Sequence, residues 1–144
     1  MLSMLRSYRF YLDLSLFFVA ENCHREKVRW LRMLPYVFND DINVPNIVTD
    51  DESRNVIFEY LYKELTRREQ SKENNKHIIV FFIDEYGFSK HPISKFVNSA
   101  QSLNVNFVFF NNDASKIASG CGYVIKTNNQ SGIIVNVELQ WFKQ

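Results

Sequence analysis

A run of six apolar residues, from Ile78 to Ile83, is the feature that most restricts how this chain can fold. An uninterrupted apolar run of this length is typical of a strand buried on both faces, and such strands lie in parallel sheets that are covered by helices. The run leads directly into two adjacent acids, Asp84 and Glu85. It therefore predicts a central parallel strand over 78–84 with two carboxyl groups at its carboxyl end.

Strand and helix patterns alternate along the rest of the chain. Strand patterns cover residues 12–19, 46–49, 78–84, 105–110, 123–126 and 133–139. Helix patterns cover residues 24–34, residues 50–69, the stretch that begins at Pro92 and a short piece near 114–118. This alternation favours a single α/β domain with a mostly parallel sheet and helices on both faces. The turn cluster 127–132 predicts that the last two strands form a β-hairpin.

The helix predicted over 24–34 has one apolar stripe. Val28, Leu31 and Leu34 make up this stripe, and Pro35 is expected to end the helix. Four basic residues lie off the stripe and are interpreted as a solvated face, namely Arg25, Lys27, Arg29 and Arg32.

The second long helix has the clearest start in the sequence. Thr49 and Glu52 have the spacing of a capping box, which predicts that the helix begins there. Apolar residues then recur every four positions at Ile57, Leu61 and Leu65, so this face is expected to pack against the sheet.

Charge and composition argue against several classes of protein. The formal net charge is +1, which gives no electrostatic argument for binding nucleic acid or an acidic membrane surface. No apolar run approaches the roughly 20 residues that cross a bilayer. Arg6 and Arg9 interrupt the apolar start of the chain, which does not fit a signal peptide. Cys23 and Cys121 lack CxxC spacing and are expected to be reduced thiols in a cytoplasmic setting.

The acidic pair after the central strand fits a site for nucleotide chemistry. In an open α/β sheet, ligands bind beyond the carboxyl ends of the strands. An acid after the central strand of a P-loop ATPase holds magnesium and a neighbouring residue positions water. Asp84 would then hold Mg²⁺ and Glu85 would activate water. Asn111, after the 105–110 strand, stands where it could sense the γ-phosphate.

The partners of such a site are missing from this sequence. A phosphate cradle requires a glycine-rich loop and a Lys. The four glycines match neither GxxxxGK[ST] nor GxGxxG; they are Gly87, Gly120, Gly122 and Gly132. Without a cradle, Mg²⁺-ATP has little to hold it, so no cofactor is expected for this chain alone. Asp84, Glu85 and Asn111 are interpreted as the vestige of a site or as half of one.

Other kinds of site find less support in the sequence. His24, His77 and His91 lack the spacing of a zinc site. Cys23 is adjacent to His24, but the sequence identifies no third partner for a nucleophilic pair. The large side chains of Trp30 and Trp141 are candidates for contact with a neighbouring domain or chain, although inward packing is an alternative for Trp30.

Seven segments of the chain follow one another in a characteristic order: YLDLSLFFV, EKVRWLRMLPYVFND, NIVTDDESRNVIFEYLYKELTRRE, HIIVFFIDE, HPISKFV, LNVNFVFF and CGYVIKTNNQSGIIV. This order resembles the degenerate first ATPase-like domain of type VII secretion motor proteins, the EssC/EccC class of the FtsK/SpoIIIE superfamily. In that family a Trp-bearing helix ends in a Leu-Pro-His type motif. Here Trp30 precedes Leu34, Pro35 and Tyr36, with Tyr in place of the usual His.

The resemblance implies a P-loop-NTPase-like domain of a membrane-anchored motor that faces the bacterial cytoplasm. It implies that the parent protein uses ATP and Mg²⁺ and exports small helical WXG100-type proteins. The partners would be adjacent ATPase domains and membrane components of the secretion system, with no role for nucleic acid. The domain itself would be structural or regulatory and would hydrolyse little or no nucleotide.

Two alternatives remain open at the level of the sequence. In one, residues upstream of Met1 supply the phosphate cradle, and Asp84 and Glu85 are catalytic in the intact protein. In the other, the chain is a free-standing α/β interaction module.

Overall fold

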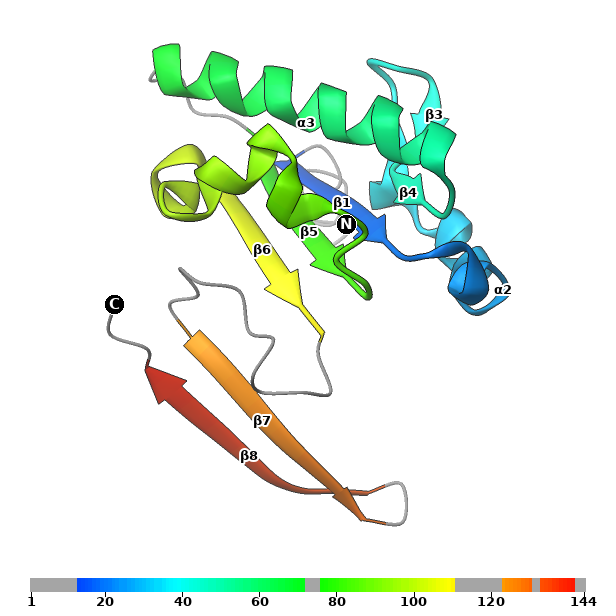
Figure 1. Ribbon diagram of the computed structural model, residues 1–144, viewed down its shortest axis with the longest axis vertical. Coiled ribbons are helices and arrows are strands. Elements are labelled where there is room, and N and C mark those ends of the chain that lie inside the picture. The colour runs from blue at the N-terminus through cyan, green and yellow to red at the C-terminus, as the bar shows by residue number, and fades with distance from the viewer. Residues whose placement is uncertain (1–12, 72–75, 111–122, 131–132, 142–144) are drawn as a thin grey trace, which may run out of the picture. The chain divides into compact units, whose positions relative to one another are not determined.

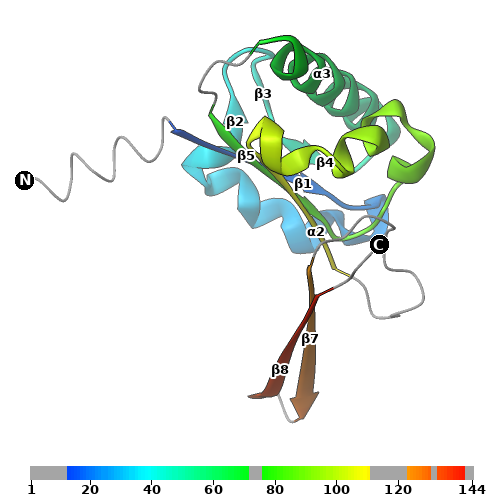
Figure 2. The ribbon, with the colours of Figure 1, turned by 90° about the vertical axis from the view of Figure 1, so that its left-hand side faces the viewer.

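The computed structural model describes residues 13–71, 76–110, 123–130 and 133–141. The chain divides into two compact units, Met1–Asn112 and Asp113–Gln144. The first unit contains a parallel sheet with helices, and the second contains an antiparallel hairpin (Figures 1 and 2).

Four parallel strands form the sheet of the first unit. They are β1 (Leu14–Val19), β4 (Ile47–Val48), β5 (His77–Phe82) and β6 (Val105–Phe109), in the spatial order β4-β1-β5-β6. β5 has a parallel neighbour on each side, which confirms the predicted central strand. Renumbered by chain order, the sheet reads 2-1-3-4, an arrangement known from doubly wound α/β folds. The α/β fold with a parallel sheet is therefore confirmed.

The two faces of β5 are buried to different degrees. Ile78, Val80 and Phe82 are buried on one face, whereas Ile79 and Phe81 on the other face keep part of their surface exposed. The prediction of burial on both faces is therefore only partly confirmed. The reason is that the helical cover on the two faces differs, which an apolar run cannot indicate.

The fully covered face of the sheet packs against α3 (Asp51–Gln70). The predicted stripe of this helix is confirmed, since Ile57, Leu61 and Leu65 are all buried in the core. Phe58 and Phe82 belong to the same core, and burying a side chain of this size contributes about 2 kcal/mol. Among the described residues, no helix combines the length and the apolar character that a bilayer crossing requires.

The start of α3 differs from the predicted one. Asp50, not Thr49, is the N-cap, and its Oδ1 accepts a hydrogen bond from the main-chain N–H of Ser53 at 2.8 Å. The Ser53 hydroxyl reaches back to the N–H of Asp50 at 3.2 Å, which completes a capping box. The expected pair of Thr49 and Glu52 is thus wrong by one residue, because Asp, Ser and Thr all suit an N-cap and only the backbone selects among them.

The segment predicted as a helix over 24–34 is wound mostly as 3-10 helix. Short 3-10 turns at Asn22–His24 and Arg29–Met33 flank a single α-helical turn, α2 (Arg25–Val28). The apolar residues of this segment are spaced three apart, and a 3-10 helix with three residues per turn places such residues on one side. Val28 and Leu31 are buried there, beneath the face of the sheet opposite α3 (Figure 2). Leu34, before Pro35, adopts an extended conformation that ends the segment.

Two further parts of the first unit depart from expectation. A small antiparallel hairpin of β2 (Phe38–Asn39) and β3 (Val44–Pro45) lies in a stretch for which no strand was expected. The helix expected from Pro92 consists of two 3-10 helices, Pro92–Val97 and Ala100–Leu103, and a further 3-10 turn, Phe88–Lys90, precedes it. Pro92 does occupy the first position of its turn, as predicted. The helical piece expected near 114–118 lies outside the described residues.

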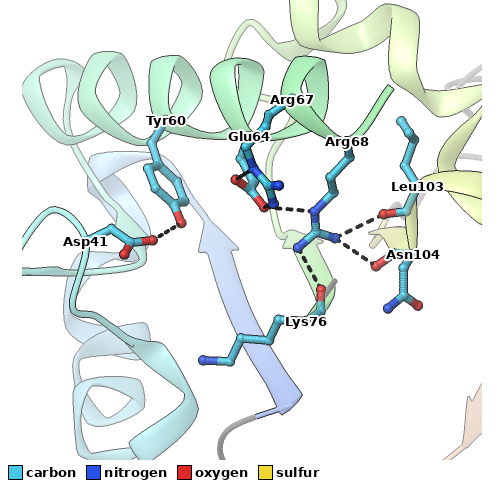
Figure 3. A network of polar contacts seen from close by, with 8 residues as sticks. All are labelled: Asp41, Tyr60, Glu64, Arg67, Arg68, Lys76, Leu103 and Asn104. Carbon is cyan, nitrogen blue, oxygen red and sulfur yellow. Dashed lines mark hydrogen bonds and ion pairs between the residues drawn. The ribbon is translucent and has the colours of Figure 1, made fainter. Parts of the chain in front are cut away.

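A buried polar network lies at the amino edge of the sheet, where β5 and β6 begin (Figure 3). The guanidinium of Arg68 donates hydrogen bonds to the main-chain oxygens of Lys76 at 2.7 Å and Leu103 at 3.0 Å, and its Nε donates to Glu64 at 2.9 Å. Only 6% of Arg68 is exposed. This one side chain therefore connects α3 with the segments that lead into β5 and β6.

The second unit is an antiparallel hairpin of β7 (Tyr123–Gln130) and β8 (Ile133–Trp141). The predicted hairpin is confirmed, but its strands are longer than expected. Residues 127–130, predicted as part of a turn cluster, continue β7, with a register shift between Asn128 and Asn129. Polar residues suit turns by composition, but ladder hydrogen bonds come from the main chain and form with any side chain except that of Pro.

Candidate functional site

The predicted acids lie at the carboxyl edge of the sheet, beyond β1 and β5. The chain leaves β1 towards β4 and leaves β5 towards β6, so the two connections diverge at this point. In doubly wound folds such a switch point is where ligands bind. The N–H of Ile83 donates to the carbonyl of Val19 at 2.8 Å, so the main chains of the two strands stay paired up to Asp84.

Asp84 is held by the segment that follows β1. Its Oδ2 accepts a hydrogen bond from the N–H of Glu21 at 2.9 Å and lies 3.4 Å from Nε2 of His24. The side chains of Asp84 and His24 are 28% and 31% exposed. Asp84 therefore joins the segment after β1 to the end of β5, while part of its surface stays accessible.

Glu85 interacts with a different part of the chain. Its Oε1 accepts a hydrogen bond from the N–H of Ser89 at 2.9 Å, within the turn that leads to the next 3-10 helix. Between them, Tyr86 and Gly87 have positive φ values of 47° and 81°. The φ of Gly87 suits glycine, which lacks a Cβ. The two acids are thus adjacent in sequence, but the structure engages them with separate partners.

The turn after the acids is tied to the start of α3. The hydroxyl of Tyr86 donates to Oδ1 of Asp51 at 2.7 Å, and the guanidinium of Arg54 lies 5.0 Å from the centre of the Tyr86 ring. These contacts stabilise the positive φ of Tyr86, which is uncommon for a bulky residue. The turn is therefore braced by polar and cation–π contacts.

The two carboxylates at this edge accept hydrogen bonds from main-chain N–H groups, and Asp84 also faces His24. Within the part of the chain that the structure describes, no three His, Cys, Asp or Glu side chains gather closely enough to hold a metal ion. Asp84 is the residue that would contact Mg²⁺ if the ion bound here, and its Oδ2 already accepts the N–H of Glu21.

The remaining predicted site residues lie apart from the two acids or outside the described residues. Asn111 and Cys121 lie outside them, so the prediction of a γ-phosphate sensor stays a prediction. Trp30 is 61% exposed, which excludes the alternative of inward packing. Trp141 pairs with Tyr123 in the backbone register of the hairpin. Cys23 is exposed, with a free thiol.

Sequence reasoning missed the pairing of Asp84 with His24. The two residues are 60 positions apart, and only the parallel pairing of β1 with β5 brings their strand ends together. The available signal was the position of His24 shortly after an apolar strand, since residues after neighbouring parallel strands share an edge. The sequence suggested His24 only as a partner of the adjacent Cys23 in a nucleophilic pair.

Comparison of the chain with models of protein families, with curated proteins and with solved structures finds no match in any of the three.

Proposed function

We propose that this chain is an ATPase-like domain that hydrolyses little or no nucleotide itself and serves a type VII protein secretion motor as a structural and regulatory module. The order of its segments, which resembles that of such motors, and its parallel α/β sheet support this assignment. The observation that carries the proposal is the engagement of Asp84 with Glu21 and His24.

A carboxylate that binds Mg²⁺ must offer its oxygen atoms to the ion. Oδ2 of Asp84 already accepts a main-chain N–H and faces a histidine. Oε1 of Glu85 accepts the N–H of Ser89 at 2.9 Å. Both acids therefore stabilise turns at the carboxyl edge. This structural role is enough to explain why the chain has two acids here, even if it hydrolyses no nucleotide.

An exposed apolar pair supports contact with the adjacent ATPase domains of the motor. Trp30 and Met33 are 61% and 86% exposed. They are three residues apart in a 3-10 helix, where such residues lie on the same side. Large exposed apolar side chains often anchor protein interfaces. In this proposal ATP and Mg²⁺ bind to the adjacent domains, and the chain works at the cytoplasmic side of the cell membrane with the secretion components and the exported helical proteins.

Phosphate release from ATP in the presence of Mg²⁺ tests the absence of hydrolysis. The full chain is expected to match the background rate, and Asp84→Asn is expected to leave that rate unchanged. Release far above background that Asp84→Asn abolishes would refute the proposal. It would show that the described chain is a catalytically competent ATPase in which Asp84 takes part.

Sedimentation of the full chain with the ATPase domains of a type VII motor from the same genome tests the proposed contact with those domains. The double change Trp30→Ala and Met33→Ala is expected to weaken the complex at least about tenfold. Val56→Ala is the matched control, because Val56 is also exposed and apolar but lies on α3. Absence of a complex with the native chain, or equal loss in the control, would contradict the role.

A further inference from the structure

A second candidate site lies beside the edge strand β4. A pocket of about 290 Å³ opens between the helical segment that contains α2 and the strand β4. Three arginines line it, Arg25, Arg29 and Arg32. Ile47 of β4 and Thr49, the residue after this strand, line it as well. The volume is sufficient for a small ligand, since a molecule of liquid water occupies about 30 Å³.

The local winding of the chain explains why the three arginines converge. Arg25 and Arg29 are four residues apart across α2, which is about one α-helical turn. Arg29 and Arg32 are three residues apart in the following 3-10 helix, where such residues lie one above the other. The change from α to 3-10 winding thus brings all three guanidinium groups to the same pocket, whereas Lys27, between them in sequence, does not line it.

The charge of the pocket is not neutralised by its surroundings. Glu26 is the one acid in its lining, and it lies 3.8 Å from Arg29 with both side chains more than 70% exposed, which makes a weak ion pair. Within the described residues, Arg25 and Arg32 have no ion-pair partner. Asp50 is a carboxylate on which they act: hydrogen bonds from Ser53 lower its pKa, and the two arginines lower it further.

Asp50 does not occupy the hydrogen-bond donors of these arginines, because its carboxylate caps the start of α3. Its carboxylate is the N-cap of α3 and accepts hydrogen bonds from the N–H and the hydroxyl of Ser53, both at 2.8 Å. The five groups Arg25, Arg29, Arg32, Glu26 and Asp50 leave an excess of one positive charge around the pocket, and its two arginines without ion pairs keep their donors for a ligand.

We propose that this pocket binds a phosphate-bearing small molecule, with Arg25 and Arg32 holding the phosphate. A guanidinium presents a fork of N–H donors that matches two oxygens of a phosphate, and it keeps its charge at every physiological pH. The buried side chains of Val28 and Ile47 form an apolar wall that suits the organic part of a phosphate ester. The site is separate from Asp84 and requires no Mg²⁺, so it stands whether or not the proposed function does.

Titration with inorganic phosphate and with phenyl phosphate tests the site in the full chain without Mg²⁺, against chloride at matched ionic strength. Both phosphates are expected to shift the Nε–H resonances of Arg25 and Arg32 in NMR spectra, and phenyl phosphate is expected to bind more tightly. Arg25→Gln with Arg32→Gln should weaken binding at least about tenfold. Glu26→Gln should strengthen it, because the change removes the opposing charge.

Lys27→Gln is the matched control, since it removes a positive charge from the same segment but not from the pocket. It is expected to change phosphate affinity less than about twofold, and Asp84→Asn should not change it at all. Equal losses in Lys27→Gln and in the arginine double variant would show only general attraction of anions and would overturn the proposal. So would a response to phosphate that equals the response to chloride.

Discussion

The two edges of the parallel sheet are built in different ways. At the amino edge, the buried Arg68 donates to main-chain oxygens from two connections and to Glu64 of its own helix. At the carboxyl edge, Asp84 is partly exposed and makes one main-chain hydrogen bond and one contact with His24. The first arrangement is largely buried and joins several segments, whereas the second is partly exposed to solvent.

This difference determines how costly each edge is to disturb. A buried guanidinium with several partners is costly to disturb, because each partner is left without a hydrogen bond when it is removed. A partly exposed carboxylate can exchange its partners for water at little cost. The carboxyl edge and the adjacent arginine pocket are therefore the regions in which side chains remain available for ligands or neighbouring domains.

The largest effect is expected from Arg68→Ala. The change leaves the buried carbonyl of Leu103 and the partly buried carbonyl of Lys76 without their donor, and the expected loss of unfolding free energy is about 3 kcal/mol. Urea denaturation measures it. Arg67→Ala is the control, because the more exposed Arg67 contacts Glu64 on the helix surface, and it should cost less than about 1 kcal/mol. Similar losses for both variants would show that the amino edge is not interlocked.

A smaller effect is expected at the start of α3, which lies near the carboxyl edge. Asp50→Ala removes the acceptor for the N–H of Ser53, and the expected loss is about 1 kcal/mol in thermal or urea unfolding. Glu52→Ala, which changes the residue of the capping box predicted from sequence, should cost less than about 0.5 kcal/mol. A larger loss for Glu52→Ala than for Asp50→Ala would indicate that Thr49 and Glu52 form the capping box instead.

Lowering the pH is expected to reduce the free energy of unfolding through Glu64, which lies at the amino edge of the sheet. Burial by itself raises the pKa of Glu64, but hydrogen bonds from Arg67 and Arg68 outweigh burial and hold the pKa below its ordinary value of 4.5. The folded state therefore binds this proton less readily than the unfolded state. The stabilisation is complete above the unfolded pKa and is lost as the pH falls through the folded pKa.

Urea midpoints measured from neutral pH down to about pH 3 provide the test. Glu64→Gln is expected to flatten part of the decline in unfolding free energy with acid. An identical pH profile for the variant and the native chain would exclude Glu64 as a source of the decline.

The smallest effect is expected for Asp84→Asn. Asparagine keeps an oxygen that accepts the N–H of Glu21 and loses only the charge that faces His24, so the expected loss is at most about 0.5 kcal/mol. Asp84→Ala removes the acceptor as well and should cost about 1 kcal/mol. A loss above about 2 kcal/mol for Asp84→Asn would mean that both edges of the sheet are equally interlocked.

The elements that could be predicted from the sequence are those whose signal is local. The apolar run from Ile78 predicted β5, and the four-residue spacing from Ile57 to Leu65 predicted the buried face of α3. The winding of residues 22–33 could not be predicted with equal success, because a spacing of three fits both an α-helical stripe and a 3-10 helix. Packing beneath the sheet selects between the two windings.

The candidate sites depended much more on the tertiary structure. The sequence by itself determined the acids after β5, the absence of a phosphate-binding glycine motif and the basic character of the α2 segment. Only the fold decided that Asp84 meets His24 across 60 residues and that Arg25, Arg29 and Arg32 line one pocket with Ile47. The physical reason is that strand pairing and helix winding set the distances between side chains, and hydrogen bonds and charge pairs act only over a few ångströms.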